Sequence, residues 1–518
     1  MSPMRYAAAA AVLSLSYGPA SQALPPDANP ALTLKIAGST IQDNNLVKLL
    51  LQACKKDGSG NTTLDQYQDT SGTGTFWKAF SCTLDSTKFT TTALTQTDPN
   101  LLILKRNRSG TITGIYPLLE PTKPINFMTV GSFCSKSSAS TATAQGKWTC
   151  DDAQTGAVVQ YTPDMGVSDI DPFIFRGVNY NTKIDSTNFN QPTVSQIANT
   201  LVVKNAGGVV QNTPVTLGLR NTLQEAQIAS GALPTTCTVG DETTACMPSL
   251  SSSLLSSIFA GRVGKWSDVV VESGGTTTSL HDLATAKPTS ELVHICRRNK
   301  GASTQAAINA YFLNTPCSGS GTVPVEVSNP VDGPVVVTPT QVTAEEICLD
   351  DFDQGTNAGN NNAAAAKAWA VGMLTTERNV PKSGAYPYHY RYVKIDGSAP
   401  SLEEVAAGHY TYFSEAAYVW RDPSGDDPKP SGDLLTVIEK IYAEATKPDL
   451  FGTLNAAIAQ PWGNGSFIAV ASQPSAAGYP VTPFDAAKPV SPYTHAPAGQ
   501  TVDNCRIPQA DEGTKPKL

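Results

Sequence analysis

The stretch from 291 to 313 has the pattern of a buried strand that runs through a polar loop into a helix. The apolar run Leu292 to Ile295 is typical of a buried strand, and apolar residues recur at helical spacing over 306–313. Between them lies RRNKGAST, from Arg297 to Thr304. The first turn of a helix presents unpaired N–H groups and the positive end of the helix dipole, to which Arg and Lys add charge. The pattern predicts an anion site, whereas a capped helix with solvated arginines is the plainer alternative.

Strand and helix patterns alternate along the rest of the chain, which is typical of α/β lobes with largely parallel sheets. We expect strands at 32–36, 157–161, 214–219 and 291–296, and further apolar runs at 100–104 and 126–130. Helices are expected over 250–259 and 303–313, and also after the turn at 38–40, through Leu46, Leu49, Leu50 and Leu51. Stretches rich in Ser, Thr, Gly or Pro are expected to be loops: 55–75, 135–147, 318–340, 355–363 and the tail after 470. With 518 residues the chain is long enough for two or three domains.

Residues 1–23 have the pattern of a secretory signal. Arg5 supplies a positive charge, Ala7 to Leu15 form a short apolar core, and Ser21-Gln22-Ala23 is a small-x-small cleavage site. That core is too short to span a bilayer, and no later segment offers the ~20 apolar residues that a spanning helix needs. We therefore expect a periplasmic or extracellular protein without a membrane span, cleaved near Ala23.

The ten cysteines all lie beyond this segment, and none forms a C-x-x-C pair. This spacing argues against zinc knuckles and thioredoxin-type chemistry, and an even count in an exported chain favours disulfides. Pairing of sequence neighbours is the simplest hypothesis: Cys54–Cys82, Cys134–Cys150, Cys237–Cys246, Cys296–Cys317 and Cys348–Cys505. The last pair would hold the C-terminal tail to the body.

The composition argues against several classes of function. A formal net charge of −8 does not suit binding to nucleic acid or anionic membranes. The sequence contains neither a G-x-S-x-G elbow nor a G-x-x-x-x-G-K-[ST] phosphate loop, and its five histidines show no H-x-x-x-H spacing. We expect neither an enzyme, nor a cofactor, nor a metal site. His294, Trp77, Trp266 and Trp420 are interpreted as core residues.

Four loops of small residues stand at expected strand-to-helix junctions: AGST at 37–40, TSGTGT at 70–75, GVSD at 166–169 and KGAST at 300–304. Each loop alone is weak evidence, because Gly, Ser and Thr are ordinary cap residues. Four of them agree with the rule that open α/β sheets bind ligands at the carboxyl ends of their strands.

The order of these elements resembles the phosphate-binding periplasmic proteins of ABC importers, which have the two-lobed type 2 periplasmic-binding fold. The shared segments are the G-S-T turn at 38–40, SGTGT at 71–75, GVSD at 166–169, PVTLG at 214–218, the Arg-to-Gln stretch at 298–305 and the passage at 394–420. The most specific match is IFAGRVGKWSD at 258–268, against the family pattern I-F-x-G-x-x-x-x-W-x-D. The resemblance spans about residues 32–445, with long insertions.

The resemblance implies an α/β chain with lobe one at 24–215 and 346–505, lobe two at 216–345, a tail at 506–518, and two crossovers as hinges. It implies a monomeric solute-binding protein that captures phosphate or a related anion by hinge closure, with an ABC permease complex as a candidate partner. The implied contact residues are Ser39, Thr40, Ser71, Asp169, Arg298, Ser303 and Thr304.

An aspartate in such a site can accept the ligand's own proton and repel sulfate, whereas a helix cap is the alternative role for Asp169. Three positions depart from the family: Lys300 replaces an acid, Ala302 a serine and Ser303 a glycine. These departures leave the ligand open: it can be another anion, or a larger phosphorylated or carboxylated molecule. A further alternative is an extracellular structural or interaction protein whose cleft is degenerate. Because strand neighbours face opposite ways, Arg297 is expected to point away from the site.

Overall fold

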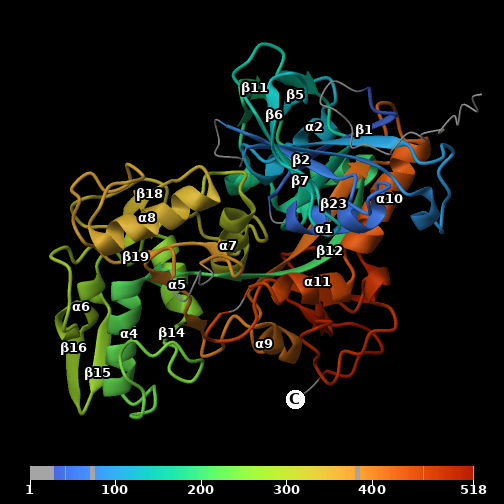
Figure 1. Ribbon diagram of the computed structural model, residues 1–518. Helices are drawn as coiled ribbons and strands as arrows, with labels where there is room; N and C mark the ends of the chain where they lie inside the picture. Colours follow the sequence, from blue (N-terminus) through green and yellow to red (C-terminus); the bar gives the residue numbers. More distant parts are fainter. Residues whose placement is uncertain (1–28, 41–42, 71–75, 380–385, 459, 517–518) are drawn as a thin grey trace, which may run out of the picture.

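The computed structural model describes residues 29–40, 43–70, 76–379, 386–458 and 460–516. The expected signal segment at 1–23 and Ser71 lie outside these residues. The described chain is a mixed α/β protein with a large and a smaller principal sheet, which lie side by side in Figure 1. Among the described residues, no helix is both long enough and apolar enough to cross a bilayer.

The large sheet takes twelve strands from the described residues. They are β1 (Leu32–Gly38), β2 (Asp65–Asp69), β3 (Trp77–Thr83), β4 (Asn100–Arg106), β6 (Cys134–Ser138), β7 (Gly146–Cys150), β9 (Met165–Ser168), β12 (Leu201–Asn212), β20 (Leu374–Thr375), β23 (Phe413–Arg421), β24 (Phe467–Val470) and β25 (Val490–Ser491). Their order is β25-β24-β12-β23-β9-β1-β4-β3-β2-β7-β6, with β20 paired to β12.

The large sheet is mixed, so the expectation of largely parallel sheets is wrong for it. β1 pairs in parallel with β4 and β9, whereas the β2–β3, β3–β4, β9–β23 and β12–β23 pairs are antiparallel. The connection between β2 and β3 is too short for the helical crossover that parallel neighbours need. The parallel trio β4-β1-β9 nevertheless brings three strand ends to one edge of the sheet.

The smaller principal sheet contains β13 (Val215–Thr216), β17 (His294–Cys296), β18 (Val335–Val337), β19 (Ala370–Val371) and β21 (Tyr390–Arg391), in the order β18-β17-β19-β13-β21. Two of these strands, β19 and β21, come from the stretch that the sequence assigned to the second part of lobe one. Strands of two residues are too short to show a periodic pattern, which is why the sequence did not reveal them.

The remaining strands form two-stranded pairs: β5 (Ile125–Met128) with β8 (Val158–Tyr161), β10 (Lys183–Ile184) with β11 (Thr187–Asn188), β14 (Ser249–Leu250) with β22 (Lys394–Ile395), β15 (Val270–Ser273) with β16 (Thr276–Ser279), and β26 (Tyr493–Thr494) with β27 (Gln509–Ala510). The α-helices of the described residues are α1 (Asp43–Ala53), α2 (Tyr116–Leu119), α3 (Val194–Thr200), α4 (Leu217–Ala229), α5 (Ser252–Phe259), α6 (Leu280–Leu283), α7 (Ser303–Leu313), α8 (Val342–Gln354), α9 (Leu402–Ala407), α10 (Gly432–Ala445) and α11 (Pro448–Asn455).

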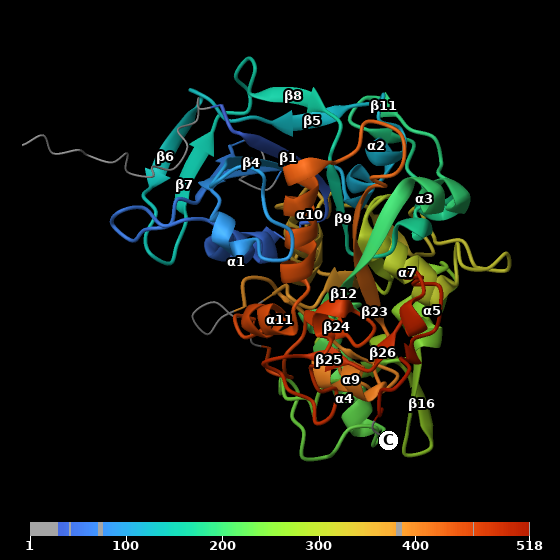
Figure 2. The ribbon, with the colours of Figure 1, turned by 90° about the vertical axis from the view of Figure 1, so that its right-hand side faces the viewer.

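Two helices cover one face of the large sheet near β1. The apolar stripe Leu46, Leu49 and Leu50 of α1 is buried there, as its helical spacing predicts. Helix α10 lies beside α1 and packs on β1, as Figure 2 shows. This packing fixes the strand end from which the first small-residue loop leaves.

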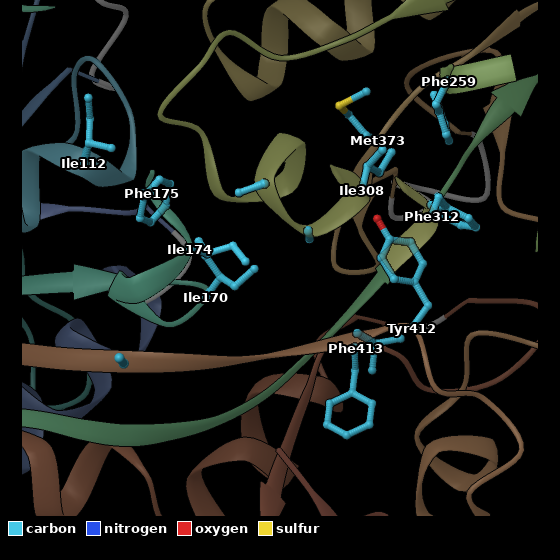
Figure 3. Close-up of a cluster of buried hydrophobic side chains, with 14 of the residues drawn as sticks. Ile112, Ile170, Ile174, Phe175, Phe259, Ile308, Phe312, Met373, Tyr412 and Phe413 are labelled. Atoms are coloured by element: carbon cyan, nitrogen blue, oxygen red, sulfur yellow. The ribbon is translucent and has the colours of Figure 1, made fainter. Parts of the chain in front are cut away.

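A continuous buried cluster joins the two sheets (Figure 3). Ile170, Ile174 and Phe175, which follow β9, belong to the same cluster as Ile308 and Phe312 of α7. Most of α7 is buried, so apolar contacts and not a single polar pair hold it in place. The N-terminus of α7 is thereby held at a defined position between the two sheets.

Several sequence expectations about individual elements need correction. Only Val215 and Thr216 of the expected strand 214–219 are extended, because α4 begins at Leu217 and buries Leu219, Leu223 and Ala226 at helical spacing. The expected loop 135–147 contains most of the β6–β7 hairpin, and 55–75 contains β2. The segment 166–168 is strand β9 and not a turn, so Asp169 follows the strand end directly. The helix predicted over 303–313 is confirmed as α7.

All ten cysteines form disulfides, of which three pairings are confirmed: Cys54–Cys82, Cys134–Cys150 and Cys237–Cys246. The predicted pairs Cys296–Cys317 and Cys348–Cys505 are wrong, because the structure joins Cys296 to Cys348 and Cys317 to Cys505. Helix α8 packs against β17, which brings the Cα atoms of Cys296 and Cys348 within 6.0 Å. Spatial proximity and not sequence order selects a pair.

Candidate functional site

A cavity of about 580 Å³ lies where the parallel strands of the large sheet meet the N-terminus of α7. Six of the seven expected contact residues line it: Ser39, Thr40, Asp169, Arg298, Ser303 and Thr304. The seventh, Ser71, lies outside the described residues. The structure therefore brings together residues that are up to 265 positions apart in the chain (39 to 304).

The first wall of the cavity is formed where β1 and β9 end. Their parallel register pairs Gly38 with Val167, so that the chain after Gly38 runs alongside Asp169. Gly38 has a φ of +121°, and a Cβ there would lie 2.0 Å from the Val167 carbonyl oxygen. Only glycine fits this conformation and this close approach, which lets the Ser39 N–H donate to the same carbonyl at 2.9 Å.

A second loop in this wall was missed by the sequence analysis. Ser109, Gly110 and Thr111 follow β4, the other parallel neighbour of β1, and line the cavity. The loop packs on the α7 loop, where the Ile112 N–H donates to the Gly301 carbonyl at 3.3 Å. A signal was present, because an apolar strand runs directly into a Ser-Gly-Thr turn.

The opposite wall is the N-terminus of α7. Ala302 occupies its N-cap position and provides no side-chain hydrogen bond to the first turn. Ser303 and Thr304 are buried, and Thr304 Oγ1 has no hydrogen-bond partner among the described residues. A first helical turn without a capping side chain, next to a cavity, offers its N–H groups to an anion.

Asp169 joins the two walls. Its Oδ2 accepts a hydrogen bond from the Ser303 hydroxyl at 2.6 Å, and the side chain is only 6% exposed. Its Oδ1 is buried without a hydrogen-bond partner in the described part of the chain. Burial raises the pKa of Asp169, against the opposing effects of the Ser303 and Ser39 hydroxyls and the Lys105 and Arg298 charges. The helix-cap alternative is not observed, because Asp171 occupies the N-cap of the next helical turn.

Arg298 supplies a buried cation on the α7 side. It is 6% exposed, its Nη2 donates to the Thr340 carbonyl at 3.2 Å, and its Nε has no partner among the described residues. Burial lowers the pKa of Arg298, which the nearby carboxyl groups of Glu345 and Asp169 oppose. An arginine remains charged in proteins, so this guanidinium can still donate to an oxyanion.

A second group of charges supports the β1 side of the cavity. Lys105 is buried, and its Nζ donates to the Ser39 carbonyl at 2.8 Å while lying 3.6 Å from Asp43 Oδ1. Asp43 Oδ2 also pairs with Lys78 Nζ at 2.7 Å. Asp43 thus partly neutralises both lysines, and Lys105 holds the backbone of the first loop in position.

The two cations that flank Arg298 in sequence point elsewhere. Arg297 Nη1 donates to the Val325 carbonyl at 2.5 Å, which confirms that this side chain faces away from the cavity. Lys300 Nζ pairs with Glu326 at 3.1 Å. The departure at Lys300 therefore adds no charge to the cavity wall. His294, Trp77, Trp266 and Trp420 are buried, as predicted for core residues.

Glu345 should make the protein less stable as the pH rises from about 5 to 8. The carboxyl group is fully buried, its Oε1 accepts from the Met373 N–H at 2.6 Å, and burial raises its pKa to about 8 from 4.5, despite the opposing Arg298 charge. The folded state therefore keeps a proton that the unfolded chain releases, so the free energy of unfolding falls across this window.

The test compares melting temperatures of the wild type and Glu345→Gln at pH 5, 6, 7 and 8. Glutamine keeps an oxygen for the Met373 N–H and cannot ionise, so the variant should lose less stability with rising pH. Equal slopes for the two proteins would show that Glu345 does not titrate in this range.

Comparisons with known proteins give structural likeness alone. No family model matches the chain, and no curated protein matches its sequence. Similar solved structures include a candidate phosphate ABC transporter substrate-binding protein with bound phosphate from Clostridium perfringens, at 10% identity over 82% of this chain and 97% of that chain, with a TM-score of 0.37. A second similar structure is an ABC-type phosphate transport receptor from Vibrio cholerae, at 10% identity over 79% of this chain and 93% of that chain, with a TM-score of 0.33. A third is PstS from Borrelia burgdorferi, at 10% identity over 82% of this chain and 96% of that chain, with a TM-score of 0.32. At these TM-scores the likeness carries no weight for ligand or function.

Proposed function

We propose that this cavity binds a protonated oxyanion such as hydrogen phosphate, and that the chain is an exported solute-binding protein. One observation carries the proposal: the buried carboxyl group of Asp169 shares a cavity with the buried Arg298 guanidinium and the uncapped first turn of α7. Arg298 and the helix N–H groups donate to the ligand's oxygens, and Asp169 accepts the ligand's own O–H.

The Asp169 carboxylate also lets the proposed site select phosphate over sulfate. Sulfate carries no proton at neutral pH, so a bare oxygen would face the Asp169 carboxylate and be repelled. Hydrogen phosphate turns that contact into a charge-assisted hydrogen bond. The site therefore separates two anions of similar size by their protonation.

Lobe movement belongs to the same proposal. We assign the large sheet to one lobe and the smaller sheet to the other in a type 2 periplasmic-binding arrangement, with β19 and β21 in the second lobe. The Ser303–Asp169 hydrogen bond then spans the lobes, so the described conformation corresponds to the closed form. Hinge opening would part this contact for ligand exchange, and an ABC permease would recognise the closed form.

Thermal unfolding of the oxidised protein without residues 1–23 tests the proposal, with phosphate and sulfate at matched ionic strength. A ligand at 100 times its dissociation constant adds about 2.7 kcal/mol to the free energy of unfolding. Each kcal/mol shifts the melting temperature by roughly 2–4 °C for domains of this size. We expect phosphate to raise the melting temperature by about 5–10 °C and sulfate to leave it unchanged. No shift with either anion at pH 6 to 8 would instead favour an extracellular interaction protein with a degenerate cleft.

A further inference from the structure

The cavity is much larger than inorganic phosphate requires. A water molecule takes about 30 Å³ in the liquid, so an ion of five heavy atoms fills on the order of 100–150 Å³. The cavity measures about 580 Å³, within the range of pockets that enclose organic ligands. Most of its volume therefore lies beyond the groups that would hold the anion.

The wall of this remaining space contains a second acid that the anion site does not need. Glu377 lines the cavity, and its Oε2 is buried without a hydrogen-bond partner among the described residues. Burial raises the pKa of Glu377. The Arg378 charge and a hydrogen bond from the Thr375 hydroxyl oppose this effect, and the Asp169 charge adds to it. Arg378 is itself held by an ion pair with Glu346, so its charge is shared.

A buried carboxylate oxygen without a hydrogen-bond donor in the described chain, such as Glu377 Oε2, is unfavourable unless the ligand provides a donor to it. Hydrogen phosphate uses its proton on Asp169 and has none left for Glu377. A hydroxyl group on the same ligand would supply the missing donor. Thr340 and Thr343 also line the cavity and can exchange hydrogen bonds with further hydroxyl groups.

Part of the cavity lining is apolar. Val342, Leu454 and Phe467 belong to it, and Leu454 and Phe467 are buried. Inorganic phosphate has no surface that gains from such contacts, whereas the carbon skeleton of an organic phosphate does. Size, a second acceptor and an apolar part of the lining thus point to the same class of ligand.

We propose, on the basis of the proposed anion site, that the cavity takes a hydroxylated phosphate monoester, a polyol or sugar phosphate. The ester binds as its monoanion: Asp169 accepts the remaining P–O–H proton, and Arg298 and the start of α7 donate to the other oxygens. The second pKa of a phosphate monoester is about 6, so this form is abundant at pH 6. One of its hydroxyl groups donates to Glu377, and its carbon atoms pack on Leu454 and Phe467.

Titration calorimetry on the oxidised, signal-free protein at pH 6, where about half of a phosphate monoester keeps a proton, compares inorganic phosphate, methyl phosphate, glycerol 3-phosphate and glucose 6-phosphate, with glucose as the phosphate-free control. We expect at least one hydroxylated ester to bind about tenfold or more tightly than inorganic phosphate, as a hydrogen bond to a buried charged group implies. Glu377→Gln should remove most of that advantage without weakening the binding of inorganic phosphate, because it takes a negative charge away from the anion. Glu272→Gln, on the exposed strand β15, is the matched control and should change neither.

The outcomes separate this inference from the anion site itself. Inorganic phosphate binding as tightly as every ester would overturn the inference and leave the anion site intact. Methyl phosphate binding as tightly as the hydroxylated esters would also overturn the inference, because the hydroxyl groups would then contribute nothing to the affinity. A protein that binds none of the phosphates, inorganic phosphate included, would remove both proposals. The wild-type ligand series decides the matter even if the Glu377 variant fails to fold.

Discussion

An Asp169→Asn variant should bind hydrogen phosphate at least tenfold more weakly at pH 7 and should acquire measurable affinity for sulfate. A hydrogen bond to a charged group contributes about 1.5–3 kcal/mol, which corresponds to roughly a 10- to 100-fold change in affinity. The carboxylate is also the group that repels a bare oxyanion, so its replacement by an amide removes the barrier to sulfate. Titration calorimetry with each anion measures both effects.

The control for this substitution is Asp332→Asn, since Asp332 is exposed and lies outside the cavity lining. It should leave both affinities unchanged. The melting temperature of Asp169→Asn must stay near that of the wild type, because Ser303 can still donate to the amide oxygen. An unchanged preference for phosphate over sulfate in Asp169→Asn would refute the role of this carboxyl group.

Removal of the Cys317–Cys505 disulfide should cause the largest loss of stability of any single pair. This bond closes a separation of 188 residues, and the chain-entropy account assigns long loops about 3–5 kcal/mol. The bond ties the segment after α7 to the C-terminal tail, where the Asn504 N–H and Nδ2 donate to Asp171 Oδ2 at 2.8 and 2.9 Å. We therefore expect Cys317→Ser/Cys505→Ser to lower the melting temperature by roughly 10 °C.

The matched variant is Cys237→Ser/Cys246→Ser, whose bond spans a separation of only 9 residues. This variant should lose about half as much stability, since the loop-closure entropy grows with the logarithm of loop length. Differential scanning calorimetry of both variants under oxidising conditions measures the contrast. Equal decreases in melting temperature would show that the Cys317–Cys505 disulfide stabilises the protein no more than a disulfide that closes a short loop.

The local features of the site could be predicted from the sequence. Helix α7 begins and ends where the pattern placed it, because a strand, a small-residue loop and a helical apolar pattern are all encoded within 291–313. Ser39, Thr40 and Asp169 meet because the parallel strands β1 and β9 end at one edge of the large sheet. Arg298, Ser303 and Thr304 follow β17 of the smaller sheet and form the opposite wall of the same cavity.

The long-range features could not be predicted in this way. The partners of Cys296 and Cys317 depend on how α8 and the C-terminal tail pack, and no local pattern encodes that packing. Glu377 follows the two-residue strand β20, which shows no periodicity, so nothing in the sequence marked it as a cavity residue. Ser109 follows an apolar run that the sequence does show, so the turn after that run is a feature that sequence patterns can indicate.

Equilibrium dialysis of labelled phosphate against the oxidised, signal-free protein at pH 7 tests the central claim most directly, with and without excess sulfate. The proposed function predicts one saturable site per chain, for which sulfate does not compete and whose affinity Arg298→Lys lowers. Absence of saturable binding, or displacement of phosphate by equimolar sulfate, would contradict a site built on Asp169 and Arg298.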